Sequence, residues 1–205
     1  MSEALILHEY SPSGNCYKVR LTAAHLGLEL ERSEYDILKG ETRTPEFLAN
    51  VNANGRIPVL QVGQRFLPES NAACFFLADG SPLIPADRFD RADMLRWMFF
   101  EQYSHEPNVA TLRFWFAYVG IEALTEAQRL QIAPKRTAGA AALALMNEHL
   151  RRRKWMVGSE LSLADICLFA YTHVADEGGF DLALYPNVVA WMERIMRLPH
   201  HVPML

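Results

Sequence analysis

The chain has few cysteines, and they follow neither a metal-binding nor a disulfide pattern. Its 205 residues include only Cys16, Cys74 and Cys167, an odd number without the spacing of a metal site. Each falls in a predicted helix among apolar neighbours, where a cysteine acts as a small buried hydrophobe. We therefore expect free thiols in a reducing compartment, with neither disulfides nor a bound metal.

Excess positive charge and long apolar runs are also missing. The chain carries 20 Lys and Arg against 24 Asp and Glu, a formal net charge of −4, so it offers no general basic surface to nucleic acid or anionic membrane. Its one basic run, at 151–154, ends a predicted helix, where cations complement the helix dipole. No apolar run approaches the length that spans a bilayer, and residues 1–7 lack the pattern of a signal peptide. Because excess positive charge, long apolar runs and a signal-peptide pattern are missing, we predict a cytoplasmic protein that binds neither nucleic acid nor membrane.

The first eighty residues alternate between short apolar segments and turn signals. The expected elements are a strand at 4–8, a helix at 16–26 ended by Gly27, a strand at 28–35, helical turns at 44–49, a strand after Pro58, a hairpin turn at 63–64 and a helix at 69–77. A β-α-β start followed by a hairpin and a helix predicts an α/β domain, with a mixed sheet covered by helices.

Two prolines within four residues, Pro82 and Pro85, interrupt this pattern after residue 79. We therefore predict a first domain at 1–79, a linker at 80–86 and an all-α domain at 87–205. The helices expected there are 87–118 with a kink at Pro107, one from Thr125 to 153, one opened by a capping box between Ser162 and Asp165, and 186–198 with proline in its first turn.

The dipeptide Ile57-Pro58 is the first feature that bears on chemistry. A proline at the start of an interior strand removes a ladder donor, so it needs a reason. One reason is a cis peptide bond, which turns the backbone N–H and C=O of Ile57 sideways, where an extended peptide could pair with them. A trans proline on an edge strand explains the same residues.

The dipeptide Glu69-Ser70 is the second feature. A helix that begins here offers unpaired N–H groups, a serine cap and a positive dipole end, which together bind a carboxylate. Glu69 beside it would hold an ammonium group. The pair therefore suits the head of an amino acid, although an ordinary N-cap preceded by an acid explains it equally well.

The third feature is the segment SPSGNCYKV at 11–19. Ser13 or Asn15 caps the following helix, and the helix dipole lowers the pKa of a thiol placed at that N-terminus. A free thiol has a pKa of about 8.5, so little of it is thiolate at neutral pH. A hydroxyl that donates to the sulfur favours the thiolate further. The alternative is a plain helix cap.

The order of these features is more specific than any one of them. A helix N-terminus after the first strand, Ile-Pro before the third and Glu-Ser opening a helix after the hairpin resemble the cytosolic glutathione transferases, in their serine-type, theta-like and bacterial branch. The resemblance covers nearly the whole chain. It implies a thioredoxin-like domain, a linker and an all-helical domain that also carries the capping box at 162–165.

The resemblance implies how glutathione would bind. Glu69 and Ser70 match the family's positions for the γ-glutamyl head, and Ile57, before the family's cis-proline Pro58, would pair with the cysteinyl backbone. Arg56 matches a basic or polar position near the glycyl carboxylate. Less specific candidates are Lys39 and Arg43.

The resemblance also implies the catalytic group. Ser13 matches the catalytic serine in the pattern Ser-x-x-Cys, and Asn15 matches an asparagine that some bacterial members use. Which of the two contacts the sulfur stays open. Tyr10 lies too early to match the tyrosine of the tyrosine-type classes. Cys16 does not fall where omega-like or beta-like members carry their cysteine, so we expect it to be a packed residue.

An electrophile would bind between the domains, against the loop at 11–19 and the helix after the linker. The polar and aromatic candidates there are Tyr103, His105, Arg113, Trp115 and Phe116. Because most aromatics at helical spacing belong to a core, we expect only some of them to face the pocket.

The expected function is that of a glutathione transferase. It would activate the thiol of its co-substrate glutathione as thiolate, for conjugation to a small hydrophobic electrophile. Two alternatives remain: a glutathione-dependent disulfide or peroxide reductase, and a non-catalytic module with the same fold. The resemblance alone implies a role in detoxification and a homodimer.

Overall fold

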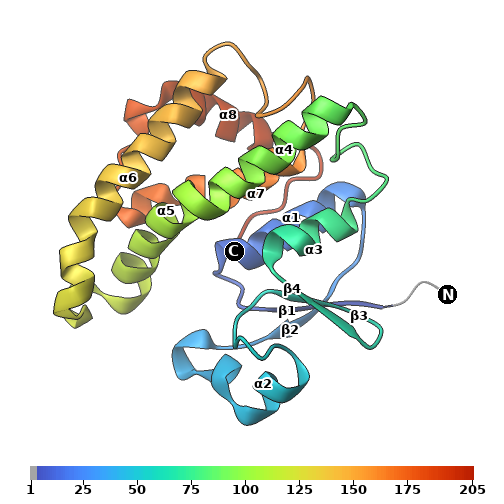
Figure 1. The fold of residues 1–205 in the computed structure, drawn as a ribbon, viewed down its shortest axis with the longest axis vertical. Helices are drawn as coiled ribbons and strands as arrows, with labels where there is room; N and C mark the ends of the chain where they lie inside the picture. Colours follow the sequence, from blue (N-terminus) through green and yellow to red (C-terminus); the bar gives the residue numbers. More distant parts are fainter. Residues whose placement is uncertain (1–3) are drawn as a thin grey trace. The chain divides into compact units, whose positions relative to one another are not determined.

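The computed structural model describes residues 4–205, which form two compact units (Figure 1). The first unit contains the described residues up to Ile84 together with the tail Pro199–Leu205, and the second is Pro85–Leu198. The sequence analysis counted the tail with the helical part. It groups with the first unit because its backbone is bonded there: the Tyr17 hydroxyl donates to the carbonyl of Val202 at 2.6 Å.

The first unit is built on a four-stranded mixed sheet in the order β2-β1-β3-β4. Its strands are β1 (Leu5–Glu9), β2 (Glu31–Glu34), β3 (Val59–Val62) and β4 (Arg65–Pro68). β1 runs parallel to β2 and antiparallel to β3, and β3 and β4 form the hairpin. The mixed sheet predicted from the order of elements is therefore confirmed.

Helices cover both faces of this sheet. α1 (Gly14–Leu26) and α3 (Ser70–Leu77) lie side by side on one face, and α2 (Pro45–Asn50) lies on the other (Figure 1). Short 3₁₀ turns, Ile37–Lys39 and Glu41–Arg43, precede α2. α1 ends as expected at Gly27, whose φ of +65° is a left-handed conformation that glycine adopts without a steric penalty.

Strand register brings three connecting segments to one edge of the sheet. His8 near the end of β1 pairs with Val59 at the start of β3, and Val59 pairs with Pro68 at the end of β4. The segments after β1, before β3 and after β4 therefore leave the sheet at the same edge. These segments carry the three features singled out in the sequence.

The second unit is helical. Its helices are α4 (Arg88–Phe100), α5 (Glu106–Arg113), α6 (Glu126–Leu150), α7 (Leu163–Thr172) and α8 (Pro186–Met196). Short 3₁₀ turns lie at Ile121–Ala123, Ala175–Gly178 and Leu182–Leu184. α6 begins at a capping box between Thr125 and Gln128, and α8 has Pro186 in its first turn.

A single kinked helix was expected at 87–118, but the structure divides this segment at more than one place. Two π-helical segments, Glu101–His105 and Phe114–Val119, flank α5. Pro107 lies in the first turn of α5, where the missing N–H removes no bond within that helix. The irregular segments therefore lie before and after α5, whereas Pro107 itself lies within α5.

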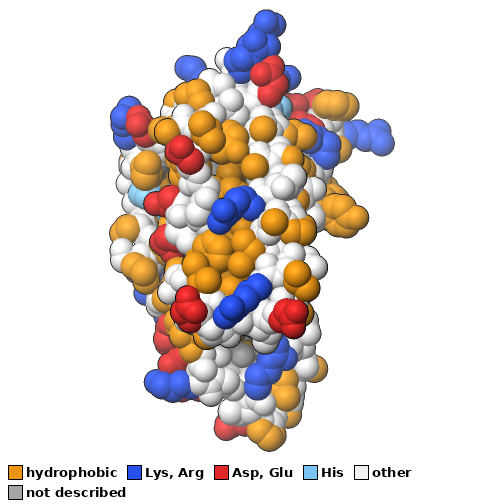
Figure 2. Space-filling model, turned by 90° about the vertical axis from the view of Figure 1, so that its left-hand side faces the viewer, with side chains coloured by type: hydrophobic (Ala, Val, Ile, Leu, Met, Phe, Trp, Pro, Cys, Tyr) orange, Lys and Arg blue, Asp and Glu red, His pale blue; other side chains and the backbone are white. Residues whose placement is uncertain are grey.

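Surface charge and hydropathy agree with the composition. Lys, Arg, Asp and Glu side chains are interspersed over the face drawn in Figure 2, without a broad area of one sign. Within residues 4–205, no helix combines the length and apolar character needed to cross a membrane.

Asp165 organises the core of the helical unit. Its carboxylate is fully buried and accepts from the backbone N–H of Met156 (2.8 Å), the indole Nε1 of Trp191 (2.9 Å), and both the N–H (3.0 Å) and hydroxyl (2.8 Å) of Ser162. The capping box predicted between Ser162 and Asp165 is thus present. The same carboxylate also joins α7 to α8 and to the segment before α7.

Replacing Asp165 with alanine is expected to lower the free energy of unfolding by ~3 kcal/mol or more, because several buried donors lose their acceptor. Asp87→Ala is the matched control. Asp87 also caps a helix, accepting from Phe89 and Asp90, but at the surface, so its loss should cost about 1 kcal/mol. Urea denaturation of both variants measures the difference, and equal losses would contradict the role assigned to Asp165.

Candidate functional site

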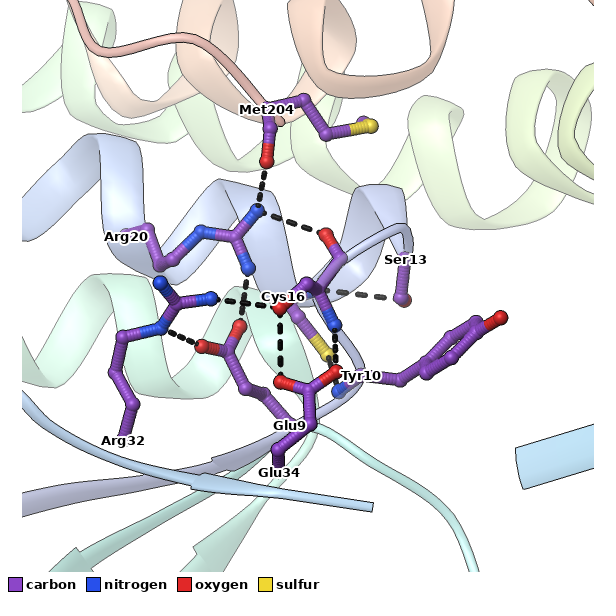
Figure 3. Close-up of polar contacts among 9 residues, drawn as sticks. Glu9, Tyr10, Ser13, Cys16, Arg20, Arg32, Glu34 and Met204 are labelled. Atoms are coloured by element: carbon purple, nitrogen blue, oxygen red, sulfur yellow. Dashed lines mark hydrogen bonds and ion pairs between the residues drawn. The ribbon is translucent and has the colours of Figure 1, made fainter. Parts of the chain in front are cut away.

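Ser13 is the N-cap of α1 and stands at the edge where the three segments meet. Its Oγ accepts from the N–H of Cys16 at 3.4 Å (Figure 3). Its own N–H donates to the carbonyl of Tyr10 at 2.8 Å. The Ser13 side chain is half-buried, and its hydroxyl proton is donated to none of residues 4–205. Ser13 therefore combines an occupied acceptor with an available donor at the positive end of a helix.

Asn15 and Ser70 connect α1 to α3. The Ser70 hydroxyl donates to Oδ1 of Asn15 at 3.1 Å, and Ser70 is buried at the first position of α3. Glu69 precedes it as an exposed residue with φ of +72°, the one non-glycine residue with positive φ among those described. Such a backbone costs about 1–3 kcal/mol and is found where the surroundings hold it for function. The structure thus brings Asn15, Glu69 and Ser70 together at one helix start.

Lys18 lies beside these residues and was not among the candidates chosen from the sequence. Its side chain is fully buried, and Nζ donates to Oδ1 of Asn71 at 3.3 Å and to Oγ of Ser70 at 3.5 Å. A buried ammonium is costly unless polar groups surround it, so these contacts fix its position. It places a positive charge beneath the first turn of α3. One signal in the sequence could have identified Lys18, because it lies between Tyr17 and Val19. Both of these neighbours are buried in the structure.

The Ile57–Pro58 peptide bond is cis, which decides between the two sequence-based interpretations. Pro58 is buried and directly precedes β3, whereas Ile57 is half-buried. The backbone N–H and C=O of Ile57 form no hydrogen bond with any described residue. They are therefore available to a strand-like ligand.

The basic candidates nearby are held in different ways. Arg56 is exposed, and its carbonyl accepts from Nδ2 of Asn52 at 2.9 Å. Nη1 of Arg43 donates to the carbonyl of Asn54 at 3.0 Å, so its side chain braces the loop before β3. Nζ of Lys39 lies 3.0 Å from Oδ2 of Asp36, and this partner raises the pKa of Lys39. Lys39 and Arg43 thus already have local partners, whereas the Arg56 side chain is exposed.

Cys16 is packed and unreactive in this arrangement. It is fully buried, its Sγ accepts from the N–H of Tyr10 at 3.4 Å, and burial raises its pKa to about 12. In Figure 3 the Tyr10 ring points away from Cys16 and Glu9. The raised pKa favours the protonated form of the Cys16 thiol.

The five candidates for an electrophile pocket differ widely in exposure. Tyr103 is 88% exposed and Phe116 is half-buried, whereas the other three are buried. Nε2 of His105 donates to Oγ1 of Thr172 at 3.0 Å, since that hydroxyl donates its own proton to a carbonyl. Trp115 is 9% exposed. His105 and Trp115 thus belong mainly to the interior of the helical unit.

Arg113, the remaining pocket candidate, also has partners inside that unit. Its Nε donates to Oε2 of Glu177 at 2.8 Å, and its Nη2 donates to the hydroxyl of Tyr118 at 2.8 Å. The sequence analysis chose Arg113 and His105 for their polar groups, and the structure shows those groups engaged in bonds between helices. Across residues 4–205, no three His, Cys, Asp or Glu side chains are grouped to hold a metal ion.

Comparison with known proteins gives a consistent result over most of the chain. Residues 3–79 match the family model "Glutathione S-transferase, N-terminal domain", and residues 110–199 match "Glutathione S-transferase, C-terminal domain". A curated relative from Fusarium sp., "Glutathione S-transferase-like protein LUC7", is 31% identical over 92% of this chain and 86% of its own length.

Solved structures agree. The crystal structure of a glutathione S-transferase from Pseudomonas fluorescens is 48% identical, covers 98% of both chains and superposes with a TM-score of 0.92. The structure of Ure2p in complex with glutathione covers 98% of this chain and 97% of its own, with a TM-score of 0.83 at 23% identity, which supports the fold alone.

The burial of the cysteines leads to a reactivity prediction. Cys16, Cys74 and Cys167 are all buried and free, so native protein at pH 8 should react with Ellman's reagent far more slowly than unfolded protein, which should release three equivalents. Cys16→Ser is compared with Cys74→Ser. A fast-reacting native thiol that disappears only in Cys16→Ser would show a reactive thiolate at this position and favour redox chemistry.

Proposed function

From the premise that the chain belongs to the glutathione S-transferase family, we propose that it is a transferase that conjugates glutathione to a small hydrophobic electrophile. Glutathione would lie along the sheet edge where the segments after β1, before β3 and after β4 meet. Ser13 would stabilise its sulfur as thiolate. The finding that carries this proposal is the Ser13 hydroxyl, which accepts from Cys16 and donates to no described residue.

The remaining contacts suit the three parts of the tripeptide. The N–H groups at the start of α3, with the Ser70 hydroxyl and the buried Lys18 ammonium behind them, favour the γ-glutamyl carboxylate. Glu69 supplies an exposed acceptor for the ammonium group. The unpaired backbone of Ile57 suits the cysteinyl residue, and the exposed Arg56 side chain is available to the glycyl carboxylate. The match of residues 3–79 to the N-terminal domain of the glutathione S-transferases supports this ligand.

The proposed chemistry needs only a lowered pKa of the glutathione thiol and the proximity of its sulfur to the electrophile. In conjugation the thiol proton leaves to solvent, and the sulfur electron pair forms a bond to the electrophilic carbon of the second substrate. On chlorodinitrobenzene, chloride then leaves with the electrons of its bond to carbon. A hydroxyl hydrogen bond to a charged sulfur is worth about 1.5–3 kcal/mol, which corresponds to roughly 1–2 units of thiol pKa.

Ser13→Ala should therefore raise the pKa of bound glutathione by roughly 1–2 units and lower turnover at pH 6.5 by ~10–100-fold, with little change in glutathione affinity. The thiolate absorbance of the complex and the pH profile of kcat with chlorodinitrobenzene measure this. Ser11→Ala is the matched control, because the Ser11 hydroxyl already donates to Oε2 of Glu34 at 2.8 Å.

Four outcomes would contradict this proposal in part or as a whole. If activity survives in Ser13→Ala but falls in Asn15→Ala, the donor to the sulfur is Asn15. If glutathione binds but only hydroperoxide or mixed disulfide is turned over, the protein is a reductase. Binding without any turnover points to a binding module, and no glutathione binding at all rejects the proposal.

Lys18→Met should weaken glutathione binding by ~10-fold, because it removes the positive charge behind Ser70 while keeping the length of the side chain. Calorimetric titration measures the affinity, and thermal unfolding checks that the variant is folded. Lys135→Met is the control, since Lys135 donates to a carbonyl, that of Pro107, within the helical unit. Equal affinity in Lys18→Met and wild type would show that Lys18 only supports the fold.

A further inference from the structure

Ser11, in the loop between β1 and α1, has all of its polar atoms in hydrogen bonds. Its N–H donates to Oε1 of Glu34 at 2.6 Å, and its hydroxyl donates to Oε2 of the same carboxylate at 2.8 Å (Figure 3). Its Oγ accepts from Nη2 of Arg32 at 2.8 Å, and its carbonyl accepts from Nη2 of Arg20 at 2.9 Å. Because these partners belong to α1 and β2, Ser11 is held from outside its own loop.

The loop itself forms a four-residue turn that leads into Ser13. The N–H of Ser13 donates to the carbonyl of Tyr10, so Ser11 and Pro12 occupy the two central positions of the turn. A proline in the second central position disfavours a type I turn, and its ring excludes the positive φ of a type II turn. The bond before Pro12 is trans, whereas a type VI turn needs a cis proline there. The turn is therefore not favoured by its own residues and depends on contacts from outside.

Glu34 connects this turn to the sheet. It ends β2, and in the parallel pair its register partner is Glu9, which ends β1. Hydrogen bonds to an ionised carboxylate are roughly twice as strong as bonds between neutral groups, and Glu34 accepts both of its bonds from Ser11. The bonds to the N–H and the carbonyl of Ser11 hold its backbone and do not depend on its side chain. Glu34 and Arg20 thus restrain the backbone just before Ser13.

Glu34 lies one step away from the proposed chemistry. Both of its carboxylate oxygens are bonded to Ser11, and it makes no bond to Ser13. It can therefore affect a sulfur bound near Ser13 either through its charge or through the orientation of the hydroxyl. A negative charge raises the pKa of a nearby thiol, whereas a well-oriented hydroxyl donor lowers that pKa. Removal of the Glu34 carboxylate thus has opposite effects on the thiol pKa in the two cases.

We propose that Glu34 is a positioning residue, which holds the turn from Tyr10 to Ser13 so that the Ser13 hydroxyl is directed at the sulfur of bound glutathione. The role of Glu34 rests on the proposed function of Ser13. Glu34 contacts neither substrate in this arrangement, so it influences the alignment of the donor and not the affinity for glutathione. Its effect belongs in kcat and in the pKa of the bound thiol.

Glu34→Ala should lower kcat with chlorodinitrobenzene at pH 6.5 by ~3–10-fold and raise the pKa of bound glutathione by roughly 0.5–1 unit, with glutathione affinity unchanged. Glu34→Gln should restore wild-type values, because its amide oxygen accepts from the Ser11 N–H and its amide nitrogen donates to Oγ. Glu31→Ala is the matched control, since Glu31 is also exposed on β2 but lies at the other end of that strand.

Two further measurements link Glu34 to the hydroxyl and to the turn. In a Ser13→Ala background, Glu34→Ala should change the thiol pKa no further, because the donor that it orients is already gone. In the ligand-free protein, amide hydrogen exchange at Ser13 should become ~3–10-fold faster in Glu34→Ala and keep the wild-type rate in Glu34→Gln. The exchange rate reports on the turn without any turnover.

The results separate a failure of the proposed function from a failure at Glu34. A wild-type thiol pKa in Ser13→Ala rejects the role of Ser13 and the role of Glu34 with it. A raised pKa in Ser13→Ala together with wild-type values in Glu34→Ala rejects the role of Glu34 alone. The same conclusion follows from a lowered thiol pKa in both Glu34 variants, from additive losses in the double variant, or from unchanged exchange at Ser13 in Glu34→Ala.

Discussion

The buried carboxylate of Glu9 is the point on which the first unit depends. It ends β1, and the guanidinium groups that pair with it come from α1 and β2. Removing one partner from a buried ion pair typically costs about 3–5 kcal/mol, because the other charge is left without compensation. Through Arg20 the same carboxylate is linked to the carbonyl of Ser11, in the loop that leads to Ser13. The position of the proposed catalytic hydroxyl therefore rests on an ion pair that takes no part in the chemistry.

The N-terminal end of α1 and one of its sides face different surroundings. The N-terminal end of α1 presents Ser13 and Asn15 toward α3, where the helix dipole and the Lys18 charge favour anionic groups. The side of α1 that faces β2 presents Arg20, Ala23 and Ala24 to a hollow of about 390 Å³. A single helix thus carries an electropositive end and a separate side lined by small residues.

Much of this arrangement could be predicted because its signals are local. A cap at Ser13 or Asn15, a stop at Gly27 and the turn at 63–64 act on their immediate neighbours. The structure has the cap at Ser13, and the stop and the turn are found as expected. The roles of Lys18 and Glu9 could not be predicted in this way. Lys18 meets Ser70 and Asn71, more than fifty residues away, and Glu9 lies one residue past the predicted end of its strand. The contact between His105 and Thr172 could not be predicted for the same reason, since the two residues are distant in sequence.

The C-terminal tail is held by its backbone. Tyr17 and Arg20 both bond to carbonyl oxygens, those of Val202 and Met204, which any amino acid supplies. The attachment therefore does not depend on which side chains the tail carries. Substitutions among the tail side chains can therefore change the surface beside α1 while the backbone attachment of the tail persists.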